Sequence, residues 1–244
     1  MYNQIYSIVN DFIKAVEQDK NFSVLLKNWN GKRGPKRKLS ITQVISLNLL
    51  RFTIHIKDLK AFHRIVKSME LLPDMPNYEN FLKTSNKSFP IIALFMQLLL
   101  VQNQLQNETG LHFIDSTPIS TCLNRRIFSH KVTKEFASRG KSTKGWFYGF
   151  KLHGVCSEKG LLESVVFTSG NINDSKMVKQ VTKNMKGRFF CDAGYLKKTK
   201  ELIELAKTGR FIYAATRQNM NRLMTCEQWE HLRNRNIIES DWAY

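Results

Sequence analysis

Two aspartates each follow a short apolar run: Asp115 comes after "LHFI" and Asp192 comes after "RFFC". A charge beside a buried strand is costly unless something compensates it. A divalent cation such as Mg²⁺ would do so, because hard cations prefer carboxylate oxygens. Paired carboxylates on adjacent strands are what metal-assisted phosphodiester chemistry needs. The alternative is that both aspartates are turn formers, since "DST" and "DAG" are common Asx-turn sequences.

A third carboxylate, Glu239, lies on a helix predicted over residues 226–240. His231, Arg235 and Glu239 are spaced by four residues, so they share one face of that helix. Glu239 is therefore placed to reach the edge of the sheet, while Arg235 orients it or contacts a phosphate. An ordinary Arg–Glu pair on the helix surface is the alternative, and the helix pattern alone favours it.

The charge balance of the chain indicates a polyanionic partner. There are 38 Lys and Arg residues against 20 Asp and Glu residues, for a net charge of +18 and a pI near 9.9. The excess is spread along the chain, and nucleic acid is the commonest partner of such a surface. A generically basic protein, or one that binds RNA as a scaffold, is the alternative.

The first basic segment, "GKRGPKRK", precedes a helix predicted from residue 40 and suits phosphate contacts on a DNA duplex. Its candidate contacts are Lys32, Arg33, Lys36, Arg37 and Lys38. A helix-turn-helix over 40–67 is a further hypothesis, with "DLKAFHRIV" as the reading helix. A solvated loop beside an ordinary helical bundle is an equally good interpretation.

The second basic segment covers residues 124–146, with seven Lys and Arg residues and Glu135 as its one acid. We predict that it lies along DNA entering the metal site. Phosphate contacts are predicted at Arg139, Lys141, Lys144 and Lys151. His130 and His153 are candidates to assist, although a lone histidine is more often a structural hydrogen-bonding residue.

Four cysteines without a CxxC pair argue against a zinc knuckle or a disulfide framework. The N-terminus has no signal-peptide pattern. The longest apolar run, "IIALFMQLLLV" at 91–101, is too short to span a bilayer and is interpreted as a buried helix. We therefore expect a soluble intracellular protein with no membrane partner.

The pattern of apolar residues changes near residue 110. Residues 1–107 show helical spacing and predict an all-helical domain, with Ser40 capping one helix. Residues 111–244 read as a strand, a hairpin over 145–157 and 161–170, and then alternating helices and strands. This order predicts an α/β fold, a mixed sheet flanked by helices.

Five stretches make the chain similar to a known family: "FIDSTPIS", "RGKSTKGWFYGFKLH", "TSGNINDSKMV", "FFCDAGY" and "RNRNIIES". They resemble, in this order, bacterial insertion-sequence transposases of the DDE class, and most closely the insertion-sequence 982 group. The N-terminal stretch "LSITQVISLNLLRF" is similar in kind.

The resemblance implies a ribonuclease-H-like catalytic domain over 111–244, after a helical DNA-binding domain over 1–107. It implies that Asp115 on the first strand, Asp192 on the fourth and Glu239 on the last helix bind Mg²⁺ or Mn²⁺. The implied activity is cleavage at the terminal inverted repeats of double-stranded DNA and strand transfer into a target. A homodimer on DNA, in the cytoplasm with the nucleoid, is also implied.

The ending "SDWAY" does not resemble the continuation that follows this glutamate in the family. A C-terminal truncation is therefore expected, and activity is uncertain for that reason. Two other functions stay open. One is a catalytically impaired DNA-binding remnant that occupies the repeats without cleaving them. The other is a nuclease of similar fold with no role in transposition.

Overall fold

The structure is a computed structural model that describes residues 1–244 apart from 21, 31–36, 144, 217–222 and 242–244. For residues 25, 28, 30 and 239–241 it describes the backbone alone. The described residues therefore do not include four of the predicted DNA contacts, Lys32, Arg33, Lys36 and Lys144. The chain forms two compact units, Met1–Leu98 and Leu99–Tyr244.

The regular elements described in the N-terminal unit are helices. They are α1 (Tyr2–Gln18), α2 (Ser23–Asn30), α3 (Ile41–Thr53), α4 (Leu59–Ser68) and the greater part of α5 (Tyr78–Leu105). The predicted cap at Ser40 is confirmed, because its hydroxyl accepts from the Gln43 amide while the Gln43 side chain accepts from the Ser40 amide. Apolar residues at helical spacing form one core here, which includes Val9, Ile13, Ile45, Phe62 and Phe81.

Helix α5 contains the run that was interpreted as a buried helix, and the structure supports that interpretation on one face only. Ile91 and Phe95 are buried, and Phe95 packs edge-on against Phe12. Within the same run Met96, Leu98 and Val101 are exposed, and 22% of the most apolar window of the helix is buried. Among the described residues α5 is the one helix long and apolar enough to cross a membrane, by length and composition, a test that core helices of soluble proteins also pass.

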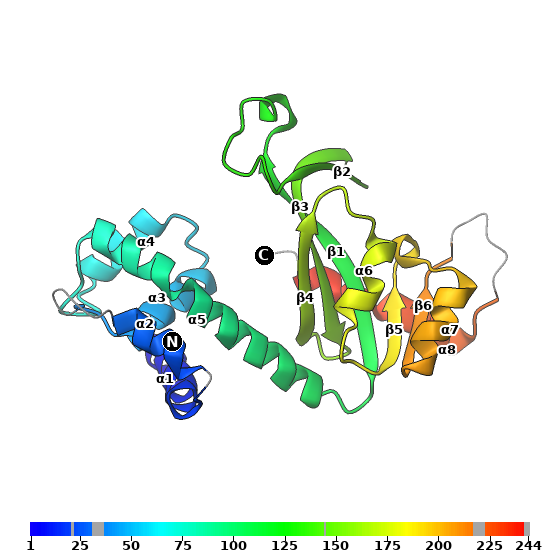
Figure 1. Ribbon diagram of the computed structural model, residues 1–244, viewed down its shortest axis with the longest axis horizontal. Coiled ribbons are helices and arrows are strands. Elements are labelled where there is room, and N and C mark those ends of the chain that lie inside the picture. Colours follow the sequence, from blue (N-terminus) through cyan, green and yellow to red (C-terminus); the bar gives the residue numbers. More distant parts are fainter. Residues whose placement is uncertain (21, 31–36, 144, 217–222, 242–244) are drawn as a thin grey trace. The chain divides into compact units, whose positions relative to one another are not determined.

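The C-terminal unit is built on a six-stranded mixed sheet (Figure 1). Strands β2, β3, β1, β5 and β6 lie in this order, and β4 also pairs with β3. Strand β3 is antiparallel to its neighbours, whereas β1, β5 and β6 run parallel. The bounds are β1 Leu111–Cys122, β2 Ser138–Ser142, β3 Gly145–Ser157, β4 Leu162–Ser169, β5 Gly187–Cys191 and β6 Arg210–Ala214. The predicted hairpin is confirmed as β3 and β4.

Helices cover both faces of this sheet, as predicted (Figure 1). Alternate residues of β1 point to opposite faces, so Ile114 packs in one core and Phe113 in another. The first core takes residues from α6 (Asp174–Val181) and α7 (Thr199–Lys207), and the second takes Ile238 and Leu232 from the C-terminal helices. This arrangement is compatible with a ribonuclease-H-like fold.

The single helix predicted over 226–240 is wrong, because two helices occupy this region: α8 (Cys226–Asn234) and α9 (Asn236–Asp241). The turn between them is at Arg235, the C-cap of α8. His231 lies against the Phe190 ring, with ring centroids 4.9 Å apart, and Ile238 is fully buried in the same core. A turn at Arg235 allows its side chain to extend towards β1 while both helices stay packed on the sheet.

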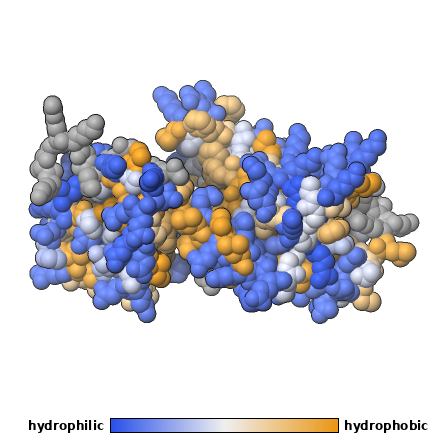
Figure 2. Space-filling model, turned by 60° about the horizontal axis from the view of Figure 1, so that its bottom comes forward, coloured by the Kyte–Doolittle hydropathy of each residue, from blue (hydrophilic) through white to orange (hydrophobic). Residues whose placement is uncertain are grey.

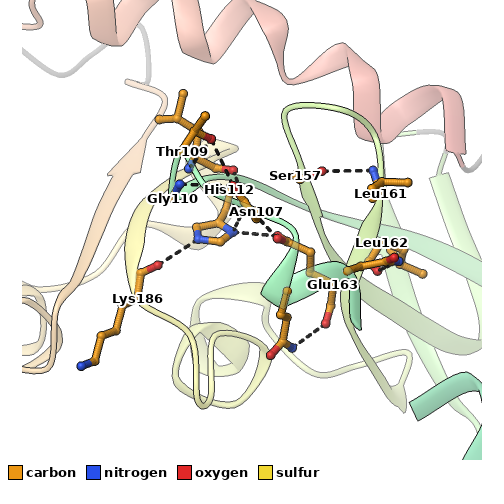
Figure 3. Close-up of polar contacts among 12 residues, drawn as sticks. Asn107, Thr109, Gly110, His112, Ser157, Leu161, Leu162, Glu163 and Lys186 are labelled. Carbon is orange, nitrogen blue, oxygen red and sulfur yellow. Dashed lines mark hydrogen bonds and ion pairs between the residues drawn. The ribbon is translucent and has the colours of Figure 1, made fainter. Parts of the chain in front are cut away.

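A buried polar network secures the start of β1 (Figure 3). The Nδ1 atom of His112 is 2.7 Å from Oε2 of Glu163, and its Nε2 atom is 3.0 Å from the carbonyl oxygen of Lys186. The amide of Asn107 donates to Oε1 of Glu163 at 2.7 Å. The Glu163 side chain is fully buried, and the His112 ring stacks on Phe189 at 4.4 Å. The network therefore joins the segment after α5 to β1 and β4.

Candidate functional site

Asp115 in β1 and Asp192 directly after β5 occupy equivalent positions relative to two neighbouring parallel strands. Ile114 of β1 pairs with Cys191 of β5, so the next residues along these strands are the two aspartates. Adjacent strands are about 4.8 Å apart, and equivalent positions point to the same face of a sheet. Both aspartates line one cleft of about 870 Å³. Asp192 follows the fifth strand in chain order rather than the fourth, because β2 was not predicted.

The Asp192 carboxylate also has the local role that the turn interpretation predicted. Its Oδ1 atom accepts from the Ala193 amide at 2.7 Å, and Asp192 caps the short 3₁₀ helix η2 (Ala193–Tyr195). A carboxylate has two oxygens and about four acceptor positions, so this cap occupies only part of its capacity. The turn former and the cation ligand are therefore compatible roles for one residue.

Asp115 is paired with an arginine from the C-terminal helices. The Nη1 atom of Arg235 is 3.3 Å from Oδ1 of Asp115, with side chains 18% and 19% exposed. The sequence placed Arg235 beside Glu239 or a phosphate, and the pairing with Asp115 was not predicted. Glu239 belongs to α9, but its side chain lies outside what the structure describes.

A third carboxylate, that of Asp174 at the start of α6, lines the same cleft. Asp174 does not cap this helix: Asn173 is the cap, because its Oδ1 atom accepts from the Ser175 amide at 3.0 Å. The Nζ atom of Lys151 donates to Oδ1 of Asp174 at 2.9 Å and to the Ile172 carbonyl at 3.3 Å. The signal in the sequence was two capping residues in a row, "ND", where a helix needs one.

Two buried residues, His153 and Tyr195, lie next to the Asp174 carboxylate. Nδ1 of His153 is 3.2 Å from the Tyr195 hydroxyl, and Nε2 is 3.1 Å from the Thr168 hydroxyl. Burial lowers the pKa of His153, although the negative charge of Asp174 acts in the opposite direction. Burial also raises the pKa of Tyr195, and the charge of Asp174 adds to that effect. Because His153 is fully buried, the structural interpretation of this histidine holds.

The predicted cations that are described lie in two places. On β2, Arg139 and Lys141 lie over the Trp146 ring, with the charged centres 4.9 Å and 5.7 Å from its centroid. Lys141 and Trp146 line the cleft with the aspartates. In the N-terminal unit, a pocket of about 520 Å³ is bordered by the cations Arg37, Lys38, Lys83 and Lys87.

The donors around the cleft are suited to a hard cation. Asp115, Asp192 and Asp174 supply carboxylate oxygens alone, which Mg²⁺ and Mn²⁺ prefer and zinc does not. In the part of the chain that the structure describes, no three His, Cys, Asp or Glu side chains already form a metal-binding group. Arg235 and Lys151 neutralise two of the carboxylates. The roles of Asp115, Asp192 and Glu239 as metal ligands stay a prediction.

A family model described as a transposase DDE domain matches residues 105–242 of the chain. The search of curated proteins found no match to the chain. The matched region contains the whole sheet, the cleft and both C-terminal helices.

Proposed function

The chain belongs to the DDE transposase family, whose domain model covers more than half of its length, and we propose that it binds terminal inverted repeats and cleaves and transfers their strands. The observation that carries this proposal is the pair Asp115 and Asp192, which come directly after the paired residues Ile114 and Cys191 of parallel strands and line one cleft. The five sequence stretches that resemble the insertion-sequence 982 group support placing the chain in that group.

Asp115, Asp192 and Glu239 are proposed to hold divalent cations, which DDE transposases generally use. When bound, Mg²⁺ or Mn²⁺ would activate the attacking oxygen and stabilise the leaving oxygen of the phosphodiester. The two parallel strands fix the aspartates before substrate arrives, so little reorganisation is needed when DNA binds. The buried His153 and Tyr195 support the wall of the cleft from behind.

Double-stranded DNA is proposed to be held at several cationic positions. Next to the cleft, Arg139, Lys141 and Lys151 would contact phosphates, with Lys151 exchanging its Asp174 partner for one. In the N-terminal unit, the basic pocket at Arg37 and Lys38 supports phosphate contact by this segment, in which Lys32, Arg33 and Lys36 also belong. A homodimer that pairs two element ends, in the bacterial cytoplasm, completes the proposal.

Removal of divalent metal is expected to abolish strand cleavage while binding to inverted-repeat DNA persists. The measurement is a nicking assay on labelled repeat DNA with Mg²⁺, with Mn²⁺ and with a chelator, beside a gel-shift assay. Binding without cleavage under every condition would favour the DNA-binding remnant. Equal cleavage of DNA without the repeats would favour a nuclease with no role in transposition.

Replacing Arg235 by glutamine is expected to tighten Mn²⁺ binding by the DNA-free protein. The Arg235 guanidinium occupies the Asp115 carboxylate that a cation would use, and the variant removes this competing charge. Two opposite charges near 4 Å attract by about 4 kcal/mol at an effective dielectric constant near 20, and partial exposure reduces this attraction. We therefore expect about a tenfold gain in affinity, measured by titration calorimetry or by electron paramagnetic resonance of free Mn²⁺. Arg233→Gln is the matched control, because Arg233 lies two residues earlier, in α8, and stacks over Trp229. Weaker binding in Arg235→Gln would instead mean that Arg235 orients the carboxylate ligands.

A further inference from the structure

The segment between β1 and β2, residues 123–137, exposes more apolar surface than a free surface segment needs. We call it the β1–β2 loop. In Figure 1 it projects away from the sheet. Phe128 is completely exposed, at 101% of its reference area, and Val132, Phe136 and Leu123 are 87%, 70% and 58% exposed. Single exposed apolar residues are ordinary, but a group of them on one projecting segment indicates a surface that a partner covers.

Cations are interspersed with these apolar side chains. Arg125, Arg126, Lys131 and Lys134 are all exposed, and Glu135 is the one acidic residue of the loop. In Figure 2 the same segment shows hydrophilic and apolar residues next to one another. The core of a protein–protein interface is poor in lysine, whereas surfaces that bind nucleic-acid strands combine cations for the phosphates with aromatic rings for the bases. The composition therefore favours nucleic acid over a protein partner.

The loop is held by its own hydrogen bonds and by contacts with β3. The Asn124 amide donates to the Trp146 carbonyl at 2.7 Å, and the Ala137 amide donates to the Thr133 carbonyl at 2.8 Å. Nε2 of His130 is 2.9 Å from the Thr133 hydroxyl, and its ring meets Tyr148 edge-on at 6.3 Å. These contacts hold the backbone on both sides of Phe128 in a defined position.

The root of the loop adjoins the cleft. Trp146, whose carbonyl anchors Asn124, lines the cleft with Asp115 and Asp192 and is itself 53% exposed. Arg139 and Lys141 lie over its ring. Trp146 and its two cations therefore lie between the aspartates of the cleft and the loop, on the path of a strand that reaches both.

We propose that the β1–β2 loop binds unpaired bases beside the cleaved phosphodiester, with Phe128 stacked on a base and the loop cations on the flanking phosphates. This inference rests on the DNA binding of the proposed function and names the form of DNA that this surface takes. In an intact duplex both faces of each base are covered by its neighbours, and exposing one costs unstacking energy. An unpaired base offers its face without that cost.

The test compares two DNA probes in a fluorescence-anisotropy titration: a duplex, and the same duplex with a central run of unpaired thymines. Phe128→Ala is expected to bind the unpaired probe about tenfold more weakly, because it removes the aromatic face on which a base stacks. Its affinity for the paired probe, and the dependence of binding on salt, should stay those of the wild type. Phe128→Trp, which keeps an aromatic face, should retain the affinity of the wild type.

Lys131→Ala is the matched control in the same loop. It should weaken binding to both probes and lower the salt slope for the duplex by about 0.9, because it removes one phosphate contact. The inference is overturned if Phe128→Ala binds the unpaired probe as tightly as the wild type, or loses affinity equally for both probes. A change in oligomeric state of Phe128→Ala by light scattering, with DNA affinity unchanged, would overturn it in favour of a protein interface. Failure of the wild type to bind either probe would instead contradict the proposed function.

Discussion

Asp115→Asn is expected to lower strand cleavage by about a thousandfold or more and to leave DNA binding within a few fold of the wild type. The substitution keeps the shape of the side chain and removes the charge that would hold a metal ion. Loss of several kcal/mol of transition-state stabilisation corresponds to this factor, since each 1.36 kcal/mol is tenfold in rate. The measurement is single-turnover cleavage of inverted-repeat DNA, with binding followed separately by anisotropy.

Asp192→Asn should lose cleavage to the same degree, and it separates the two roles of this residue. Asparagine caps helices as well as aspartate does, so the bond to the Ala193 amide can persist while the charge is lost. Glu201→Gln, on the exposed side of α7 and paired with Lys197, is the control and should cleave normally. Cleavage at the wild-type rate by Asp115→Asn would show that the chemistry takes place elsewhere.

The position of the two aspartates could be predicted from sequence because each follows a run of apolar residues that only a buried strand explains. Asp174 could not, because "NINDS" is already explained by helix capping, and only the fold reveals that Asn173 is the cap. The pairing of Arg235 with Asp115 depends on a turn between α8 and α9 that the helical spacing of 226–240 hides.

A strand that forms because it pairs with a neighbour, without an alternating sequence pattern, could not be predicted from the sequence either. Strand β2, with the sequence "SRGKS", lacks alternating apolar residues and is a strand because it pairs with β3 from Ser138 opposite Gly149 to Ser142 opposite Gly145. The fold class followed from the order of helices and strands, which is a local signal. Contacts between residues distant in sequence, such as His112 with Glu163, had no local signal.

Glu163→Ala is expected to lower the free energy of unfolding by about 3–5 kcal/mol, the cost of removing one partner from a buried ion pair. The substitution leaves Nδ1 of His112 and the Asn107 amide buried without their carboxylate partner. Chemical denaturation followed by circular dichroism measures the loss. The matched control is Glu204→Ala, whose carboxylate lies 2.9 Å from Lys179 but is 63% exposed, so the expected change is below about 1 kcal/mol.

Glu163→Gln distinguishes the hydrogen bonds of this network from its charge. Nε2 of His112 donates to the Lys186 carbonyl, because a carbonyl only accepts, and Nδ1 donates to the Glu163 carboxylate for the same reason. In Glu163→Gln the ring can keep its Nε2 proton alone, and Nδ1 then accepts. A glutamine amide can donate there while its oxygen accepts from Asn107, and Glu163→Gln should therefore recover part of the stability lost in Glu163→Ala. Since His112 and Asp115 are three residues apart on β1, amide exchange along β1 should accelerate in Glu163→Ala and not in Glu204→Ala. Equal losses of stability in the two alanine variants would mean that the network does not hold β1 in place.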